Sequence, residues 1–217
     1  MERGKPRTLP DADAVATIAP AKREPSDAAE DWAGVEVYTV GHSTRSLPDL
    51  IALLRQFGIA ALADVRAFPR SRRNPQFNLE ALTETLPAAG MAYAHLPRLG
   101  GRRRGRDDSP NDGWRNASFR AYADYMQTPD FAQGLRELRE LGRAGPVALM
   151  CAEAVPWRCH RSLIADALTI RGVAVREIVG PTRAEVHRLT PFARVDGLRI
   201  TYPADGAQAP EEPHADG

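Results

Sequence analysis

The stretch IAALADV (residues 59–65) is an almost unbroken apolar run with one acidic side chain, Asp64, near its end. A strand of this composition is buried on both faces, which is typical of a parallel sheet covered by helices. Two other runs rich in β-forming residues, VEVYTV (35–40) and VALMC (147–151), have a similar character. Together these runs predict the centre of a parallel sheet.

Segments with helical periodicity alternate with the apolar runs along the chain. Ser46 is placed to cap one such helix, and Gly58 is placed to end it. The expected strands are 35–40, 59–65, 91–96, 147–151 and 173–179, and the expected helices are 46–57, 78–89, 118–126, 129–141 and 156–171. This alternation predicts an α/β fold with a mostly parallel, doubly wound (Rossmann-like) sheet and helices on both faces.

The two ends of the chain differ in composition from its middle. Residues 1–33 carry prolines, alanines and scattered charges without apolar periodicity, and residues 204–217 have the same character. Such segments bury too little apolar surface to offset the entropy of ordering them. We therefore expect disordered tails at 1–33 and 204–217, and a single α/β domain at 34–203, which is long enough for one core.

The sequence shows no signal for a membrane or for secretion. Neither end has the apolar core of a signal peptide, and no run approaches the roughly 18 apolar residues that a membrane helix needs. We therefore expect a cytoplasmic protein with no membrane partner. In that compartment its two cysteines favour reduced thiols over a disulfide framework.

The expected domain is basic, although the whole chain has a formal net charge of only +1. Residues 34–203 hold 24 basic and 17 acidic side chains, a difference of +7, and all 24 basic side chains are arginine. Arginine suits bidentate binding of phosphate or carboxylate, although a codon bias also explains the absence of lysine. Two arginine-rich segments, 70–73 and 98–106, lie in expected loops with Trp114 and Phe119 nearby. This combination favours a nucleotide or nucleic acid as ligand.

Reactive side chains gather where three of the expected strands end. GHST (41–44) follows the first strand, DVR (64–66) lies at the end of the second, and CAEAVPWRCHRS (151–162) lies at the end of the fourth. The carboxyl ends of parallel strands meet at one edge of the sheet, where helix N-termini also converge. We therefore expect these segments to form one site.

The side chains in these segments indicate a reaction rather than packing alone. We predict three catalytic roles: Cys151 as a nucleophilic or redox thiol, His160 as a general acid or base, and Glu153 or Asp64 as its carboxylate partner. We predict that the substrate is bound by His42, Ser43, Thr44, Arg66, Arg70, Arg158 and Arg161.

Structural roles remain open for several of these residues. A cysteine such as Cys151 often packs as a small apolar side chain at a strand end. Asp64 can form a buried salt bridge with Arg66 or Arg161 that only fixes the edge of the sheet. His42 can serve packing or capping. Cys159, expected in the first turn of a helix, is a second candidate for a thiolate.

A metal centre is not favoured by the spacing of the possible ligands. Cys151, Cys159 and His160, together with Glu153 or His42, would supply four ligands. However, the two cysteines are eight residues apart, which matches neither a zinc ribbon nor a zinc finger. We therefore predict no metal ligand, and the sequence identifies no cofactor.

Four ordered motifs carry a resemblance to a known family: YTVGHSTRS (38–46), DVRAFPRSRRNPQFN (64–78), YMQTPDF (125–131) and ALMCAEAVPWRCHRSLIAD (148–166). Over residues 35–180 the chain resembles the bacterial and archaeal family called domain of unknown function 488. The resemblance implies a compact α/β fold and no particular reaction. It also implies a site at Gly41, His42, Ser43, Thr44, Asp64, Arg66, Pro69, Cys151, Glu153, Cys159, His160 and Arg161.

The leading hypothesis is an α/β enzyme with a Cys/His/Glu/Arg site at the C-terminal edge of the sheet. Its substrate would be anionic, either phosphate-bearing or of nucleotide or nucleic-acid type. One alternative is a non-catalytic nucleic-acid-binding or regulatory protein that uses the arginine-rich loops. Another is a metal-dependent enzyme with Cys, His and Glu ligands. The expected partner is an anionic small molecule or a nucleic acid.

Overall fold

The computed structural model describes Met1 and residues 31–204. The tails expected at 1–33 and 204–217 therefore lie almost entirely outside the described residues. Trp32 and Val35, near the start of the described segment, are already buried in the core. Among the described residues, no helix is long and apolar enough to cross a lipid bilayer.

A six-stranded sheet with strand order β3-β2-β4-β1-β5-β6 forms the centre of the fold. Its strands are β1 Val37–Gly41, β2 Ala61–Asp64, β3 Ala92–His95, β4 Val147–Cys151, β5 Val175–Gly180 and β6 Arg183–Val186. All of them run parallel except β6, which pairs antiparallel with β5 at one edge. The expected α/β class with a mostly parallel sheet is confirmed.

Three short strands near the C-terminal end of the domain were not predicted from the sequence. They are β6 and the two strands of a separate hairpin, β7 (Arg194–Asp196) and β8 (Arg199–Thr201). Most of their side chains are exposed or half-buried. Because little apolar surface is buried there, the sequence carries no strong alternating pattern to reveal them.

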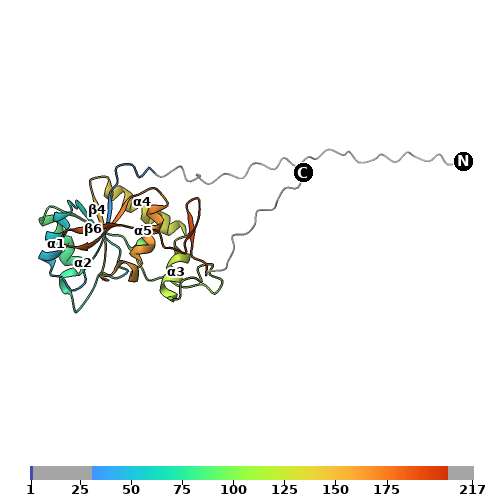
Figure 1. The fold of residues 1–217 in the computed structure, drawn as a ribbon, viewed down its shortest axis with the longest axis horizontal. Helices are drawn as coiled ribbons and strands as arrows, with labels where there is room; N and C mark the ends of the chain where they lie inside the picture. The colour runs from blue at the N-terminus through green and yellow to red at the C-terminus, as the bar shows by residue number, and fades with distance from the viewer. Residues whose placement is uncertain (2–30, 205–217) are drawn as a thin grey trace. The chain divides into compact units, whose positions relative to one another are not determined.

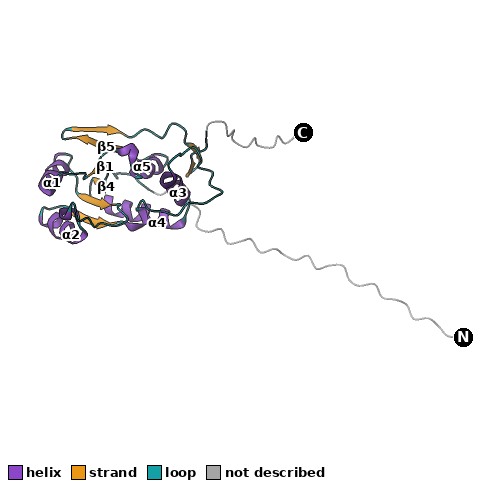
Figure 2. Cartoon of the chain, turned by 90° about the horizontal axis from the view of Figure 1, so that it is seen from below, coloured by secondary structure: helices purple, strands orange, loops and turns teal. Residues whose placement is uncertain are grey.

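Helices cover both faces of the sheet, as the sequence predicts. They are α1 Leu47–Gln56, α2 Leu79–Ala88, α3 Ala117–Tyr125, α4 Pro129–Gly142 and α5 Arg161–Thr169. Successive residues of β2 alternate between two cores, since Leu62 packs with α1 and α2, whereas Ala61 and Ala63 pack with α3, α4 and α5. Figure 1 and Figure 2 both place α1 and α2 on one side of the strands and α4 and α5 on the other.

The helix expected at 156–171 is shorter in the structure. Pro156–Arg158 forms a 3-10 turn, and α5 begins at Arg161 with His160 as its N-cap residue. Cys159 therefore precedes the helix in an extended conformation, instead of lying in its first turn. This short extended link brings the Cys159 side chain back beside Cys151 at the end of β4.

Strands β1 and β4 are neighbours whose following connections leave on opposite faces of the sheet. The chain passes from β1 into α1 on one face, and from β4 into α5 on the other. In open parallel sheets this arrangement leaves a crevice at the carboxyl ends of the two strands, where ligands bind. The last residues of these strands, Gly41 and Cys151, are register partners. The segment 151–162 therefore starts at this crevice.

A buried polar network ties the C-terminal part of the domain to α5. His187 donates hydrogen bonds to Asp166 and Glu177, each 2.8 Å long. The hydroxyls of Thr190 and Tyr202 donate to the same Asp166 carboxylate. Burial alone would lower the pKa of His187, but its bonds with the two carboxylates outweigh burial and raise the pKa to about 9.

This network predicts that the fold loses stability in mildly alkaline solution. His187 titrates near 6.5 when unfolded and near 9 when folded, so its contribution is full below about pH 6.5 and disappears as the pH rises through about 9. We expect a loss on the order of 2 kcal/mol, measured by urea unfolding across that interval. His187→Gln should remove this part of the pH dependence. An equal alkaline loss in the variant would contradict the assignment.

Candidate functional site

The loop after β4 crosses directly over the end of β1. A Cβ atom on Gly41 would lie 2.1 Å from the carbonyl oxygen of Glu153 and 2.7 Å from Cα of Ala154. The backbone N–H of His42 also donates to the Cys151 carbonyl at 2.9 Å. Only glycine permits this close approach, so the end of β1 fixes the path of the loop that carries Glu153.

Three reactive atoms meet beside this loop. The Sγ atoms of Cys151 and Cys159 and a ring nitrogen of His160 all lie within 4.8 Å of one another, and Cys159 Sγ is 3.6 Å from His160 Nδ1. His160 Nε2 lies 2.9 Å from the Val65 carbonyl oxygen. Because a carbonyl oxygen only accepts, Nε2 carries a proton, and Nδ1 is the ring nitrogen that faces the cysteines. Nδ1 donates to a thiolate when the ring is protonated and presents its lone pair when the ring is neutral. We call these three residues the Cys/His cluster.

The two thiols have opposite electrostatic environments. A hydrogen bond from Cys151, reinforced by His160 and by the charge of Arg161, holds the pKa of Cys159 well below its ordinary value despite burial. The same bond between the thiols, together with burial, raises the pKa of Cys151. Cys159 is the buried member of the pair, and Cys151 is half-buried. These surroundings favour negative charge on Cys159, whereas the sequence pointed to Cys151 as the reactive thiol.

Arg161 is buried beneath the Cys/His cluster, with only 1% of its surface exposed. Its Nε donates to Cys159 Sγ at 3.3 Å, and its Nη2 donates to the Glu153 carbonyl. Among the described residues, its Nη1 has no hydrogen-bond partner and no carboxylate pairs with the guanidinium. A buried cation needs compensating negative charge, which here can come only from sulfur or from a bound anion.

Asp64 and Arg66 form a buried salt bridge, which is one of the roles that the sequence left open. Arg66 Nε donates to Asp64 at 2.8 Å, and the Tyr93 hydroxyl donates to the same carboxylate at 2.9 Å. Arg66 also donates to the Phe77 carbonyl at 2.7 Å. Burial would lower the pKa of Arg66, but its bonds to Asp64 raise it. Asp64 therefore orients Arg66 from behind.

His42 supports Arg66 from the other side. It is 2% exposed and stacks on Phe77 with ring centroids 4.1 Å apart. Its Nδ1 donates to the Ser43 carbonyl at 2.9 Å, and its Nε2 lies 3.5 Å from Arg66 Nη1, from which it accepts. Burial, with the charge of Arg66, lowers the pKa of His42, and only the neutral ring can accept from Arg66 in this way. In this geometry His42 serves packing and orientation.

A cleft of about 540 Å³ opens over the Cys/His cluster. Such a volume suits a small ligand. The predicted site residues that line it are Arg66, Arg70, Cys151, Glu153, Arg158 and His160, and Cys159 joins them. Segments that are far apart in the chain therefore converge at one opening.

A comparison with protein-family models identifies the family of the chain. A family model described as Domain of unknown function DUF488 matches residues 46–168. The chain belongs to the DUF488 family. Comparisons with curated proteins and with solved structures give no match. In this DUF488 protein the matched residues include the whole Cys/His cluster and the Asp64–Arg66 pair, whereas His42 precedes them.

The structure does not bring every predicted residue of the DUF488 protein to the cleft. Ser43 and Thr44 are outside its lining, although Ser43 adopts the unusual φ of 49°. His42, Asp64 and Arg161 lie behind the lining and hold it in place.

The sequence did not predict the contact between Gly101 and His160. A Cβ atom on Gly101 would lie 2.5 Å from His160 Nδ1, so the loop of Gly101 packs directly on the imidazole ring. The glycine-rich run RLGGRRRGR (98–106) could have indicated this contact, because a backbone that approaches a ring this closely requires glycine.

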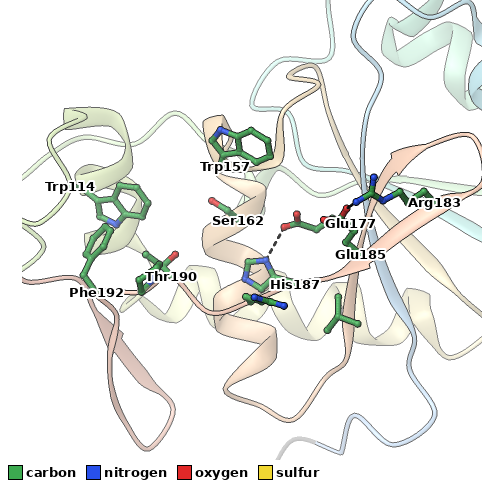
Figure 3. A pocket seen from close by; sticks show the side chains of 12 residues that line it. Trp114, Trp157, Ser162, Glu177, Arg183, Glu185, His187, Thr190 and Phe192 are labelled. Carbon is green, nitrogen blue, oxygen red and sulfur yellow. Dashed lines mark hydrogen bonds and ion pairs between the residues drawn. The ribbon is translucent and has the colours of Figure 1, made fainter.

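The DUF488 protein has a second hollow of about 860 Å³ beside α5, shown in Figure 3. Trp114, Trp157 and Phe192 contribute its aromatic wall. Its histidine, His187, is already bonded to Glu177 and Asp166. Its lining contains no cysteine, whereas both cysteines line the first cleft.

Proposed function

We propose that the protein is an enzyme that acts on an anionic, phosphate-bearing substrate in the cleft over the Cys/His cluster. The observation that carries this proposal is the meeting of two thiols, an imidazole and guanidinium groups in one cleft, lined by the segments that follow β2 and β4. Costly buried charges such as Arg66 and Arg161 are rarely gathered by packing alone. Their concentration beside reactive atoms supports a catalytic site.

Arg158 is the side chain best placed to bind the anionic group. It lines the cleft and is exposed, and no carboxylate pairs with it among the described residues. Arg70 also lines the cleft, but it lies 3.4 Å from Glu80 in a surface ion pair. Arg66 contributes a fixed positive charge from the cleft wall. Guanidinium groups in this arrangement match the oxygen atoms of a phosphate group.

The proton chemistry is assigned to His160 and Glu153. His160 presents Nδ1 toward the cysteines while the Val65 carbonyl holds Nε2, so the ring is oriented for proton transfer or ligation. Glu153 is exposed and lines the same cleft, which allows it to exchange protons with solvent.

The arginine-rich loop favours a small substrate over a long nucleic acid. Arg103 donates to the backbone carbonyls of Pro97, Arg98 and Gly100 and lies over the Tyr125 ring. Arg98 pairs with Glu137, and Arg106 pairs with Asp108. These arginines fold the loop onto the protein, so fewer of them remain for the phosphates of a polymer.

Binding of inorganic phosphate tests the proposed substrate class. We expect phosphate to raise the melting temperature of the protein, and we expect Arg158→Ala to weaken phosphate binding about tenfold through loss of a charge-assisted hydrogen bond. Arg194→Ala, in β7 and outside the cleft lining, is the matched control and should bind like the wild type.

The same ligand should slow alkylation of the Cys151–Cys159 pair by iodoacetamide, because an anion in the cleft covers both thiols and iodoacetamide reacts with the thiolate form, which the surroundings favour at Cys159. Mass spectrometry of the modified peptide measures this protection. Equal phosphate affinity in Arg158→Ala and Arg194→Ala, or no protection of the two thiols, would overturn the assignment of the anion to this cleft.

A further inference from the structure

We propose that Cys151, Cys159 and His160 bind one divalent cation of the Zn²⁺ class and leave a coordination position open toward the cleft. This inference deepens the proposed function, because it names the cofactor of the same cleft. It departs from the expectation that the chain has no metal ligand. That expectation rested on the spacing of the cysteines, which matches neither a zinc ribbon nor a zinc finger.

The distances in the Cys/His cluster fit tetrahedral zinc. Bonds of about 2.3 Å to sulfur and about 2.05 Å to nitrogen place a sulfur and a nitrogen ligand about 3.6 Å apart, and two sulfurs about 3.8 Å apart. Cys159 Sγ and His160 Nδ1 are 3.6 Å apart. No pair of ligand atoms in the cluster is more than 4.8 Å apart, so closing around an ion requires a shift of about 1 Å at most.

Neighbouring groups orient the ligands as metal sites require. The Val65 carbonyl accepts from His160 Nε2 at 2.9 Å, which fixes the tautomer whose Nδ1 is free to ligate. Arg161 Nε donates to Cys159 Sγ at 3.3 Å, a bond that a metal-bound thiolate accepts as well as a free one. A simple disulfide between the cysteines would need neither the directed imidazole nor its carbonyl partner.

The donor set selects the ion and its coordination number. Two sulfurs and one imidazole favour zinc over hard cations such as magnesium or calcium. No fourth Cys, His, Asp or Glu joins the group within the part of the chain that the structure describes. Both ring nitrogens of His42 are engaged, and Asp64 is bonded to Arg66. Three protein ligands with an open position are typical of catalytic zinc, whereas structural zinc sites have four.

The charge of the site explains why an anion would take the open position. A divalent cation and two thiolates sum to zero, and the buried Arg161 then leaves one uncompensated positive charge beside them. A hydroxide or a substrate oxygen at the open position would balance it. Zinc would supply Lewis-acid polarisation of that oxygen, while Glu153 in the cleft lining exchanges its proton.

Zinc binding by the full-length protein under reducing conditions tests this site. We expect one zinc ion per chain in competition with a chromophoric chelator, and a thiolate-to-cobalt charge-transfer band when Co²⁺ replaces zinc. Cys159→Ser and His160→Gln should each weaken zinc binding by at least about 100-fold, because each removes a ligand. The control His95→Gln alters a histidine that contacts the Arg66 carbonyl outside the cluster and should bind zinc like the wild type.

A second measurement uses the unmodified protein, so it holds even if a variant fails to fold. Zinc should protect both cysteines from alkylation, as read by mass spectrometry. Failure of the reduced protein to bind zinc, or wild-type affinity in His160→Gln, would overturn the metal site. If zinc is not bound but phosphate binding still depends on Arg158, only the metal inference fails. If zinc is bound but Arg158→Ala binds phosphate as tightly as the wild type, the metal site stands and the proposed substrate class fails.

Discussion

Asp64→Asn is expected to destabilise the fold by about 3–5 kcal/mol, which lowers the melting temperature by about 10 °C or more in a chain of this size. Asp64 is fully buried and Arg66 is 7% exposed, so the substitution leaves a largely buried guanidinium without its counter-charge. The Tyr93 hydroxyl loses its charged acceptor at the same time. Thermal and urea unfolding of the purified variant measure the loss.

Glu80→Gln provides the matched control for this prediction. It also removes one carboxylate from an arginine–carboxylate pair, but Glu80 and Arg70 are 67% and 79% exposed. Exposed pairs contribute little because water and salt screen them, so we expect a change below about 0.5 kcal/mol. Comparable unfolding curves for Asp64→Asn and Glu80→Gln would show that the buried pair does not have the structural role assigned to it.

Gly101→Ala is expected to disable the Cys/His cluster while the protein stays folded. The added methyl group would lie 2.5 Å from His160 Nδ1 and within 3 Å of two neighbouring ring atoms, so the ring has to leave its present position in the cluster. We expect zinc affinity to fall by about tenfold or more, since small displacements of a ligand are costly, and stability to change by only about 1 kcal/mol. The Nδ1 resonance of His160 in NMR spectra reports the displacement directly.

Gly105→Ala is the control for the effect of a methyl group in the same loop. Its Cβ would be in ordinary contact, 3.8 Å from the Cβ of Ala121, and touches nothing in the cleft lining. This variant should retain the zinc affinity and the His160 resonance of the wild type. An unchanged His160 resonance in Gly101→Ala would contradict the packing of this loop on the ring.

The sequence predicted the main sheet because its central strands are buried on both faces. In β1, β2 and β4 almost every side chain is buried, so runs such as 59–65 and 147–151 are nearly continuous apolar segments. The edge strand β6 and the hairpin β7–β8 lack this property, so they have no comparable signal.

The sequence also predicted that the segments after β2 and β4 meet, because strand ends of a parallel sheet converge whatever the detailed loop path. Six of the fifteen residues that line the cleft are predicted site residues. The sequence could not give the contacts that decide individual roles. The position of Cys159 depends on an extended link between a 3-10 turn and α5, which helical periodicity does not reveal. The contact of Gly101 with His160 joins residues 59 positions apart, and no local pattern encodes it.

The bonds that hold Arg66 and Arg161 in place have a consequence for selectivity. Both guanidiniums are fixed by hydrogen bonds, to the Asp64 carboxylate and to the backbone carbonyls of Phe77 and Glu153, so the cleft wall has its final shape before any ligand arrives. A preorganised wall loses little conformational entropy on binding. It also adapts poorly, so a molecule whose negative charge is displaced from the guanidinium groups by about an ångström gains little binding free energy. We therefore expect a narrow range of accepted molecules rather than broad tolerance.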